Sequence, residues 1–538
     1  MTLWKNIRKW SKKSQQTKSD FATSFRKRSL SSDLQTNIDQ IKEEFGSSPD
    51  VIIREFLLGT ESVLKVAMIY MDGLVNKNAI FHFVGHFLNG EYQKDWLANA
   101  NPHESLLHFL RNHAHEIHEL RTIETWNEMM LSCLSGDTVI LIDGSNNGIG
   151  GNTRGGELRQ ISESTTQVVI RGPKDAFIES IGTNIALVRR RIKNPNLWLE
   201  NMEIGKVTRT DVAILYLHGI AKEDLIKDIK KRLLEIEIDS IMESGNIEEL
   251  IEDQTFTPFP TIYNTDRPDI IAANIIEGRV AIFVDGTPFV LIVPTIFSQF
   301  FQSAEDYYQR FDFATFVRLL RYVSFFISVM GPSIYIALIT FHQEMIPSQL
   351  LFSLVSSREG VPFPALVEAL MMELSFEILR EAGVRMPRSV GQAVSIVGAL
   401  VLGQAAVQAG IVSPAMVIVV AITGIASFAT PAFNIAITAR MLRFVLMILA
   451  ASFGAFGITM GMIFIVAHMT SLQSFGTPYL SPLGPFNIID QKDTFIRFPL
   501  WSVITRSKLF RVKKYAQTSK ETPSALSNHG ERNGDGAQ

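Results

Sequence analysis

The chain has 538 residues, a formal net charge of -3 at pH 7 and one cysteine, Cys133. One cysteine excludes an internal disulfide framework and gives no cysteine-based metal cluster, so we expect neither a bound metal nor a cofactor. The near-neutral charge argues against nucleic acid as the main partner. Polar and apolar residues are segregated along the chain, which indicates several structural regions.

The first region, residues 1–35, is rich in lysine and arginine and lacks the apolar stretch of a secretory signal. We expect a disordered basic arm. An alternative is that Trp4 and Trp10 rest on an anionic membrane surface.

The second region contains an internal repeat. VAMIYMDG at residues 66–73 is similar to VAILYLHG at residues 212–219, and GDTVILIDG at 136–144 is similar to GRVAIFVDG at 278–286. The repeat predicts two soluble α+β subdomains, residues 36–157 and residues 158–293.

Each repeat ends with Asp-Gly after an apolar run, a pattern that predicts a tight β-hairpin. We therefore assign residues 279–293 to a closing hairpin and not to a membrane span. The glycines of GSNNGIGGNTRGG at residues 144–156 predict a flexible polar loop, because a phosphate-binding loop would end in lysine followed by serine or threonine.

Residues 294–470 read as a helical membrane domain. No charged residue lies between Arg388 and Arg440, and Ser413-Pro414 divides this stretch into two halves that could each cross a bilayer. Residues 322–341 and 444–467 are also charge-free, which gives about four spans, preceded by an aromatic-rich interfacial segment. Residues 471–538 should form a polar, largely disordered tail.

A polar stripe is predicted along the span formed by residues 415–438. Thr423, Ser427, Thr430 and Asn434 follow one another at helical spacing, so one continuous helix would carry them on one side. They could line a water-filled ion path or form hydrogen bonds between helices.

An acidic helix is predicted between the first span and the charge-free stretch. Glu373, Glu377 and Glu381 share one face, and Glu368 lies near the apolar side, where it would be an unpaired carboxylate. The acidic face could be the wet side of a helix at the membrane surface. In a ring of identical subunits it could instead concentrate cations near an axis.

The stretches EGRVAIFVDGTPFVLIVPTIF, residues 277–297, and PFPALVEALMMELSFEILREAG, residues 362–383, resemble the A subunits of GerA-type germinant receptors of endospore-forming bacteria. The resemblance implies a non-enzymatic, multi-pass subunit of the spore inner membrane, with its soluble region in the cytoplasm, that responds to nutrients and starts germination. It also implies a transporter-like B subunit, a lipoprotein C subunit and a homo-oligomeric ring, a pentamer, that is a ligand-gated path for monovalent cations. The alternative is a non-conducting scaffold, or a germination-associated paralogue, that docks a transporter-like partner.

Overall fold

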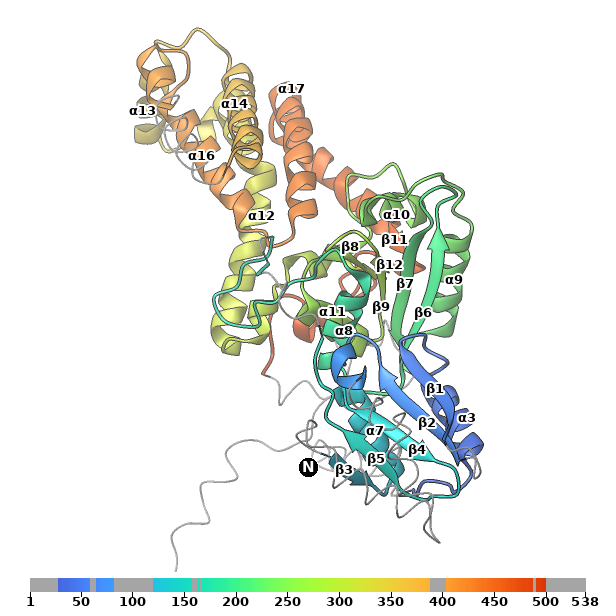
Figure 1. Cartoon of the computed structure of the whole chain (residues 1–538). Coiled ribbons are helices and arrows are strands. Elements are labelled where there is room, and N and C mark those ends of the chain that lie inside the picture. Colours follow the sequence, from blue (N-terminus) through green and yellow to red (C-terminus); the bar gives the residue numbers. More distant parts are fainter. Residues whose placement is uncertain are drawn as a thin grey trace, which may run out of the picture.

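The computed structural model describes residues 28–58, 64–81, 120–156, 163–164, 166–387, 403–486 and 490–499. Two antiparallel sheets with their helices form a soluble module, and a bundle of long helices rises beside it (Figure 1). The predicted α+β class of the N-terminal region is confirmed. The described residues leave out residues 82–119, most of the predicted basic arm and most of the predicted C-terminal tail.

Subdomain 1 contains a five-stranded antiparallel sheet with strand order β1-β2-β4-β5-β3. Its elements are α3 (Leu34–Glu44), β1 (Val51–Leu58), β2 (Leu64–Met71), β3 (Leu120–Ile123), α7 (Trp126–Ser135), β4 (Thr138–Ile142) and β5 (Gly148–Gly151). The helices α3 and α7 pack on one face through Ile38, Ile41, Met129 and Cys133, all buried.

Subdomain 2 has the same strand order, β6-β7-β9-β10-β8. Its elements are α8 (Ile181–Arg191), β6 (Leu197–Ile204), β7 (Thr210–Leu217), α9 (Glu223–Leu234), α10 (Ser244–Ile251), β8 (Tyr263–Thr265), α11 (Pro268–Glu277), β9 (Val280–Val284) and β10 (Val290–Val293). The repeated sequences occupy equivalent central strands: Val66 pairs with Ile142 in one sheet and Val212 with Val284 in the other.

The predicted hairpins are present in both subdomains, since β4 pairs with β5 and β9 pairs with β10 in antiparallel register. The Asp-Gly pairs lie in the two connections, and their aspartates have a further role. Asp143 accepts a hydrogen bond from the Leu34 N–H at the start of α3, and Asp285 accepts one from the Ile181 N–H at the start of α8, each at 3.1 Å. A free N–H at a helix start needs an acceptor, and a carboxylate also interacts well with the positive end of the helix. Both connections are longer than the two-residue turns that the Asp-Gly pattern predicts.

The glycine-rich stretch after Asp143 is also not the flexible loop that we predicted. Residues Gly148–Gly151 form β5, which is fully buried between β4 and β3. A side chain at Gly148 would lie 2.9 Å from the Leu141 side chain, and one at Gly150 would lie 3.0 Å from Ile123. The glycines therefore allow a strand to pass where no larger residue would fit.

Among the residues that the structure describes, the helical bundle contains five helices of more than ten residues. They are α12 (Phe311–Thr340), α13 (Ser348–Arg358), α14 (Ala365–Arg385), α16 (Pro414–Phe428) and α17 (Phe433–Ser471). The predicted span at residues 322–341 lies within α12. The predicted span at residues 389–412 lies mostly outside the described residues.

The helix α17 is a hairpin and not one long rod. Gly454 has φ 63° and ψ -143°, a backbone conformation that breaks the helix into two arms. A side chain at Gly457 would collide with the backbone of Leu449, and one at Gly461 would lie 2.5 Å from Leu446. Residues so far apart in one helix touch only if the chain doubles back, so the predicted single span at residues 444–467 is wrong.

The predicted boundaries of the two terminal segments are also wrong. Leu30 and Leu34 are buried in subdomain 1, although both fall within the predicted basic arm. Leu472 and Tyr479, in the predicted tail, are buried in one apolar core that joins subdomain 2 to the base of the bundle. Farther on, Asp493 forms an ion pair of 2.8 Å with Arg318 of α12. These contacts fix the soluble module against the helices.

Candidate functional site

The acidic helix α14 is oriented opposite to the expectation for a surface helix. Its carboxylates Glu368 and Glu373 are buried among the other helices, whereas its apolar residues Leu374 and Ile378 are 58 % and 62 % exposed. The interpretation of the acidic face as a wet surface is therefore wrong for Glu373. The helix α14 packs on α12, α16 and α17 within the bundle.

Glu373 belongs to a buried polar cluster that joins three helices. Its Oε2 lies 2.5 Å from Nη1 of Arg443 on α17. The same guanidinium donates through Nε to the backbone carbonyl of Ser328 on α12 at 2.7 Å, and through Nη2 to the Ser328 hydroxyl at 3.0 Å. Because a buried charge is costly without a partner, this cluster ties α12, α14 and α17 to one another.

The next acidic residues of α14 lie progressively closer to solvent. Glu377 accepts from Arg440 of α17 at 2.9 Å and from Arg380 at 3.2 Å. Glu381 pairs with Arg385 at 2.6 Å, and its side chain is 64 % exposed. The acidic residues of this face thus recur every four positions, and their exposure to solvent increases from Glu373 to Glu381.

Glu368 is not unpaired, which corrects the prediction. Its Oε1 accepts from Arg358 of α13 at 2.8 Å, and its Oε2 accepts from the Ser413 N–H and hydroxyl at 3.0 Å and 2.8 Å. Ser413 is the N-cap of α16, and its hydroxyl also accepts from the N–H of Met416. Glu368 therefore fixes the start of α16 between α13 and α14.

The polar stripe does not lie on one continuous helix. The chain leaves the helical conformation between Phe428 and Phe433, beside Pro431, so α16 carries Thr423 and Ser427 while α17 carries Asn434. Thr430 lies in the break and is buried. The predicted alignment of Thr423, Ser427, Thr430 and Asn434 along one helix is therefore wrong.

Two buried hydroxyls of the stripe, and that of Thr438 farther along α17, have hydrogen-bond acceptors within the chain. Thr423 donates to the carbonyl of Val419 at 2.7 Å, and Ser427 donates to the carbonyl of Gly424 at 2.6 Å. Thr438 donates to the carbonyl of Pro258 in the soluble module. Asn434 is half-buried.

The outer faces of the bundle are apolar. Exposed examples are Phe316 and Val323 on α12, Ile422 and Ile425 on α16, and Val445 and Phe464 on α17. Two helices, α12 and α17, are long and apolar enough to cross a membrane, although α17 is bent at Gly454. Only 39 % and 28 % of the residues in their most apolar windows are buried, which differs from the core helices of a soluble protein.

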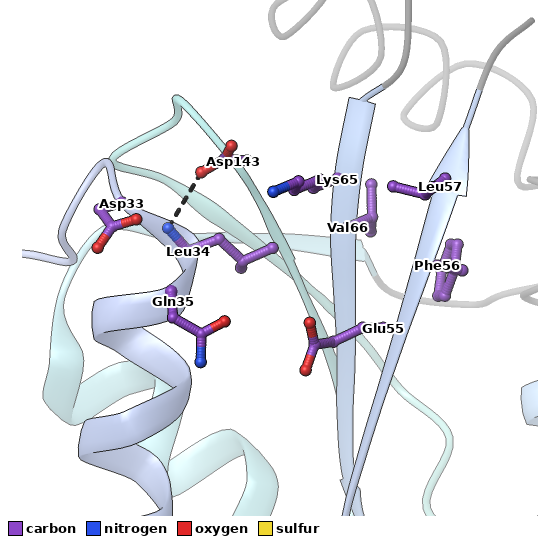
Figure 2. A pocket seen from close by; sticks show the side chains of 9 residues that line it. All are labelled: Asp33, Leu34, Gln35, Glu55, Phe56, Leu57, Lys65, Val66 and Asp143. Atoms are coloured by element: carbon purple, nitrogen blue, oxygen red, sulfur yellow. Dashed lines mark hydrogen bonds between the residues drawn. The ribbon is translucent and has the colours of Figure 1, made fainter.

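The soluble module offers a weaker candidate. A pocket of about 280 Å³ lies where α3 begins, between β1, β2 and the turn that carries Asp143 (Figure 2). Its charged groups are Asp33, Glu55, Lys65 and Asp143, and Asp143 already occupies the N-terminus of α3. Among the described residues, no three His, Cys, Asp or Glu side chains gather as a metal ion would require.

Sequence reasoning missed the basic partners of the acidic helix. Arg358, Arg440 and Arg443 each pair with a carboxylate of α14. A partial signal was present: Arg440 and Arg443 lie three residues apart and Glu373 and Glu377 lie four residues apart, so each pair spans about one helical turn. Such spacings let two packed helices form successive ion pairs, but they do not identify which helices pack.

Comparison with known proteins places this architecture in a family. The family model described as "Bacillus/Clostridium GerA spore germination protein" matches residues 39–509. "Spore germination protein KA" of Bacillus subtilis (strain 168) is 52% identical over 88% of this chain and 86% of its own length. "Uncharacterized membrane protein YfkQ" of the same organism is 44% identical over 89% of this chain and 91% of its own length.

A solved structure is similar to about half of this chain. It is the crystal structure of the N-terminal domain of the A subunit of the Bacillus megaterium spore germinant receptor GerK3, with 44% identity, a TM-score of 0.41, and coverage of 51% of this chain and 98% of that chain. The family match extends over nearly the whole sequence, through both sheets and the helical bundle. This chain therefore belongs to the GerA family of spore germination proteins.

Proposed function

We propose that the protein is the A subunit of a nutrient-responsive germinant receptor in the spore inner membrane, where it helps to start germination. The observation that carries this proposal is the family match over residues 39–509. It is supported by relatives named as spore germination proteins, such as GerLA of Bacillus cereus at 40% identity. The proposed role is non-enzymatic.

The proposed membrane placement puts the helical bundle in the bilayer and the soluble module in the cytoplasm. The bundle has the charge distribution that lipid requires, with ion pairs inside and apolar side chains outside. The basic character of residues 1–35 and 506–514 favours the cytoplasmic side for both ends. In this placement, the four described segments that cross the bilayer are α12, α16 and the two arms of α17. The helix α14 lies beside α16.

The proposed assembly is a homo-oligomeric ring, a pentamer, with a transporter-like B subunit and a lipoprotein C subunit. We propose that the ring encloses a path for monovalent cations and that the present arrangement is its closed state. The carboxylates of Glu373 and Glu377 are neutralised by Arg443 and Arg440, so they cannot attract a cation until these helices separate. Glu377, Glu381 and Asn434 are the candidate path residues that remain partly exposed.

The receptor role is tested in spores. Deletion of this gene should abolish or slow the loss of refractility in at least one nutrient, and the intact gene in trans should restore it. Unchanged germination in a panel of amino acids and sugars would contradict the proposal.

The conducting role is tested with the purified oligomer in liposomes. We expect K⁺ or Na⁺ flux that falls when Glu373, Glu377 and Glu381 are changed together to Gln. Flux that is unaffected by the triple change would remove the acidic helix from the path.

A specific observation favours a second candidate, a non-conducting scaffold that docks a transporter-like partner. Thr423 and Ser427 bond within their own helix, and the α14 carboxylates bond to arginines of the same chain, as packing contacts would. Cysteines at residues 423, 427 and 430 separate the two candidates. Reaction with a water-soluble thiol reagent supports a wet path, and uniform protection supports the scaffold.

A further inference from the structure

The loop between α10 and β8, residues 252–262, contacts both arms of the α17 hairpin. Thr257 Oγ1 lies 2.9 Å from His468 Nε2 on the second arm, and the Pro258 carbonyl accepts a hydrogen bond from Thr438 on the first arm. Phe259 is buried, and its ring centroid lies 6.1 Å from that of His468 and 6.3 Å from that of Tyr479. These contacts fix the position of the loop next to Thr438 and His468, which lie near the two open ends of the α17 hairpin.

Phe256, the residue before these contacts, projects into open space. It is 100 % exposed, whereas Phe259, three residues later, is 2 % exposed. A single exposed apolar side chain needs no explanation by itself, so what matters is where the anchored loop places this ring relative to the bundle.

The apolar outer surface of the bundle reaches the level of this loop. Ile437 and Met441 on the first arm and Phe464 and Val466 on the second arm are exposed, and they flank the two residues that hold the loop, Thr438 and His468. If lipid covers this surface, its polar boundary lies close to Phe256. Aromatic rings are favoured at that boundary, where they contact both acyl chains and headgroups.

The surroundings of Phe256 fit a lipid surface better than a protein partner. Its neighbours Gln254 and Thr255 are polar and exposed, so one ring protrudes from a polar loop and no broad apolar patch surrounds it. A stable protein interface needs a contiguous surface of about 800 Å² on each partner. The nearest carboxylate on the loop, Asp253, is paired with Arg232 at 2.6 Å and accepts from the Phe475 N–H, so its charge is partly neutralised against anionic headgroups.

We propose that Phe256 inserts into the headgroup region of the membrane and anchors subdomain 2 to the lipid surface. This inference rests on the proposed placement of the bundle in a bilayer. The anchor would fix the height of the loop that contacts both arms of α17. Subdomain 2 would then contact the membrane through its own side chain as well as through the helices.

The experiment uses the full chain in vesicles of phosphatidylglycerol and phosphatidylethanolamine. Phe256→Cys, Val207→Cys and Phe464→Cys are each labelled with an environment-sensitive fluorophore, and lipids with a headgroup-level or chain-level spin label act as quenchers. Val207, in the β6–β7 connection, is 77 % exposed and serves as the matched soluble control, while Phe464 is 67 % exposed on the second arm of α17. The native Cys133 is buried, and the unsubstituted chain measures any background labelling.

We expect the label at residue 256 to shift to shorter wavelength and to lose intensity with headgroup-level quencher, while the label at residue 207 keeps its emission. Equal emission at residues 256 and 207, with quenching at residue 464, would overturn the anchor and leave the membrane placement intact. A blue-shifted label at residue 256 that no lipid quencher affects would assign the site to a protein partner and also overturn it. An unquenched label at residue 464 would overturn the membrane placement, and the anchor with it.

Discussion

The soluble module and the helical bundle differ in where they place apolar side chains and ion pairs. In the two sheets, apolar side chains fill the interior, and ion pairs such as Lys206–Glu237 lie at the surface. In the bundle, ion pairs such as Arg443–Glu373 are buried, and apolar side chains cover the outside. Removing one partner should therefore cost little at Lys206–Glu237 and much at Arg443–Glu373, because the cost depends on how far the pair lies from water.

The largest expected effect comes from removing the cation of the buried cluster. Arg443→Met leaves the Glu373 carboxylate buried without its partner, which should destabilise the bundle by about 3–5 kcal/mol. The measurement is thermal unfolding of the purified chain in detergent. Arg443→Met combined with Glu373→Leu should recover much of the loss. A single variant as stable as the parent would show that water already reaches this pair.

The hairpin of α17 should be the next most sensitive feature. Gly454→Ala places a side chain 2.9 Å from His342 and 3.0 Å from Phe341 in a backbone conformation that only glycine adopts readily. The expected cost is about 1–3 kcal/mol in the same unfolding assay. Gly360→Ala, where a side chain meets nothing within 4 Å, is the control. Equal stability of the two variants would contradict the hairpin geometry.

The repeated helix caps should have equal, moderate effects. Asp143→Ala and Asp285→Ala each remove the acceptor at the start of a helix, at an expected cost of about 1 kcal/mol. Hydrogen exchange should show faster exchange of the Leu34 amide in the first variant and of the Ile181 amide in the second. A large effect of one variant alone would mean that the duplicated caps have diverged in role.

One carboxylate of the module should make its stability depend on pH. Burial, with the nearby charges of Glu252 and Glu243, raises the pKa of Glu248 from 4.5 to about 7, although a hydrogen bond from Asn264 partly opposes this. The folded state therefore holds this proton more tightly than the unfolded state. The contribution of Glu248 to the stability of subdomain 2 should be full below about pH 4.5, fall as the pH rises to about 7 and then level off. Glu248→Gln should flatten this slope in urea unfolding, and Glu249→Gln should keep it.

The smallest effect is expected at the solvent end of the acidic helix. Glu381→Gln breaks an exposed pair with Arg385, so its effect on unfolding should be below about 1 kcal/mol. The free energy of unfolding should therefore be far less affected than by Arg443→Met. A comparable loss would mean that Glu381 is buried by a neighbouring subunit in the purified oligomer.

The duplication and the apolar regions could be predicted because they rest on local patterns. The strands at residues 66–71 and 212–217 followed from repeated apolar runs, and α12 contains its predicted span. The partners of the acidic helix could not be found in this way. Arg358, Arg440 and Arg443 reach α14 from other helices, and their pairing depends on how those helices pack.

Two errors came from rules that tertiary contacts override. Asp-Gly pairs favour tight turns, but both aspartates here serve a helix more than a hundred residues away in the chain. The apolar run on either side of Gly454 gave no sign of reversal, because no charged residue interrupts it between Phe444 and Ala467. Gly457 and Gly461 allow close packing, and this packing joins two arms of one chain.

In the proposed membrane placement, the reversal at Gly454 also sets the side on which the described residues after α17 lie. The second arm returns the polypeptide to the soluble module, where Ser474 donates to the carbonyl of Thr261, and farther on Asp493 pairs with Arg318 in α12. A reporter fused after residue 499 should therefore occupy the same compartment as one fused before residue 28. If α17 were straight, the C-terminal segment would emerge on the far side of the bilayer and lose these contacts.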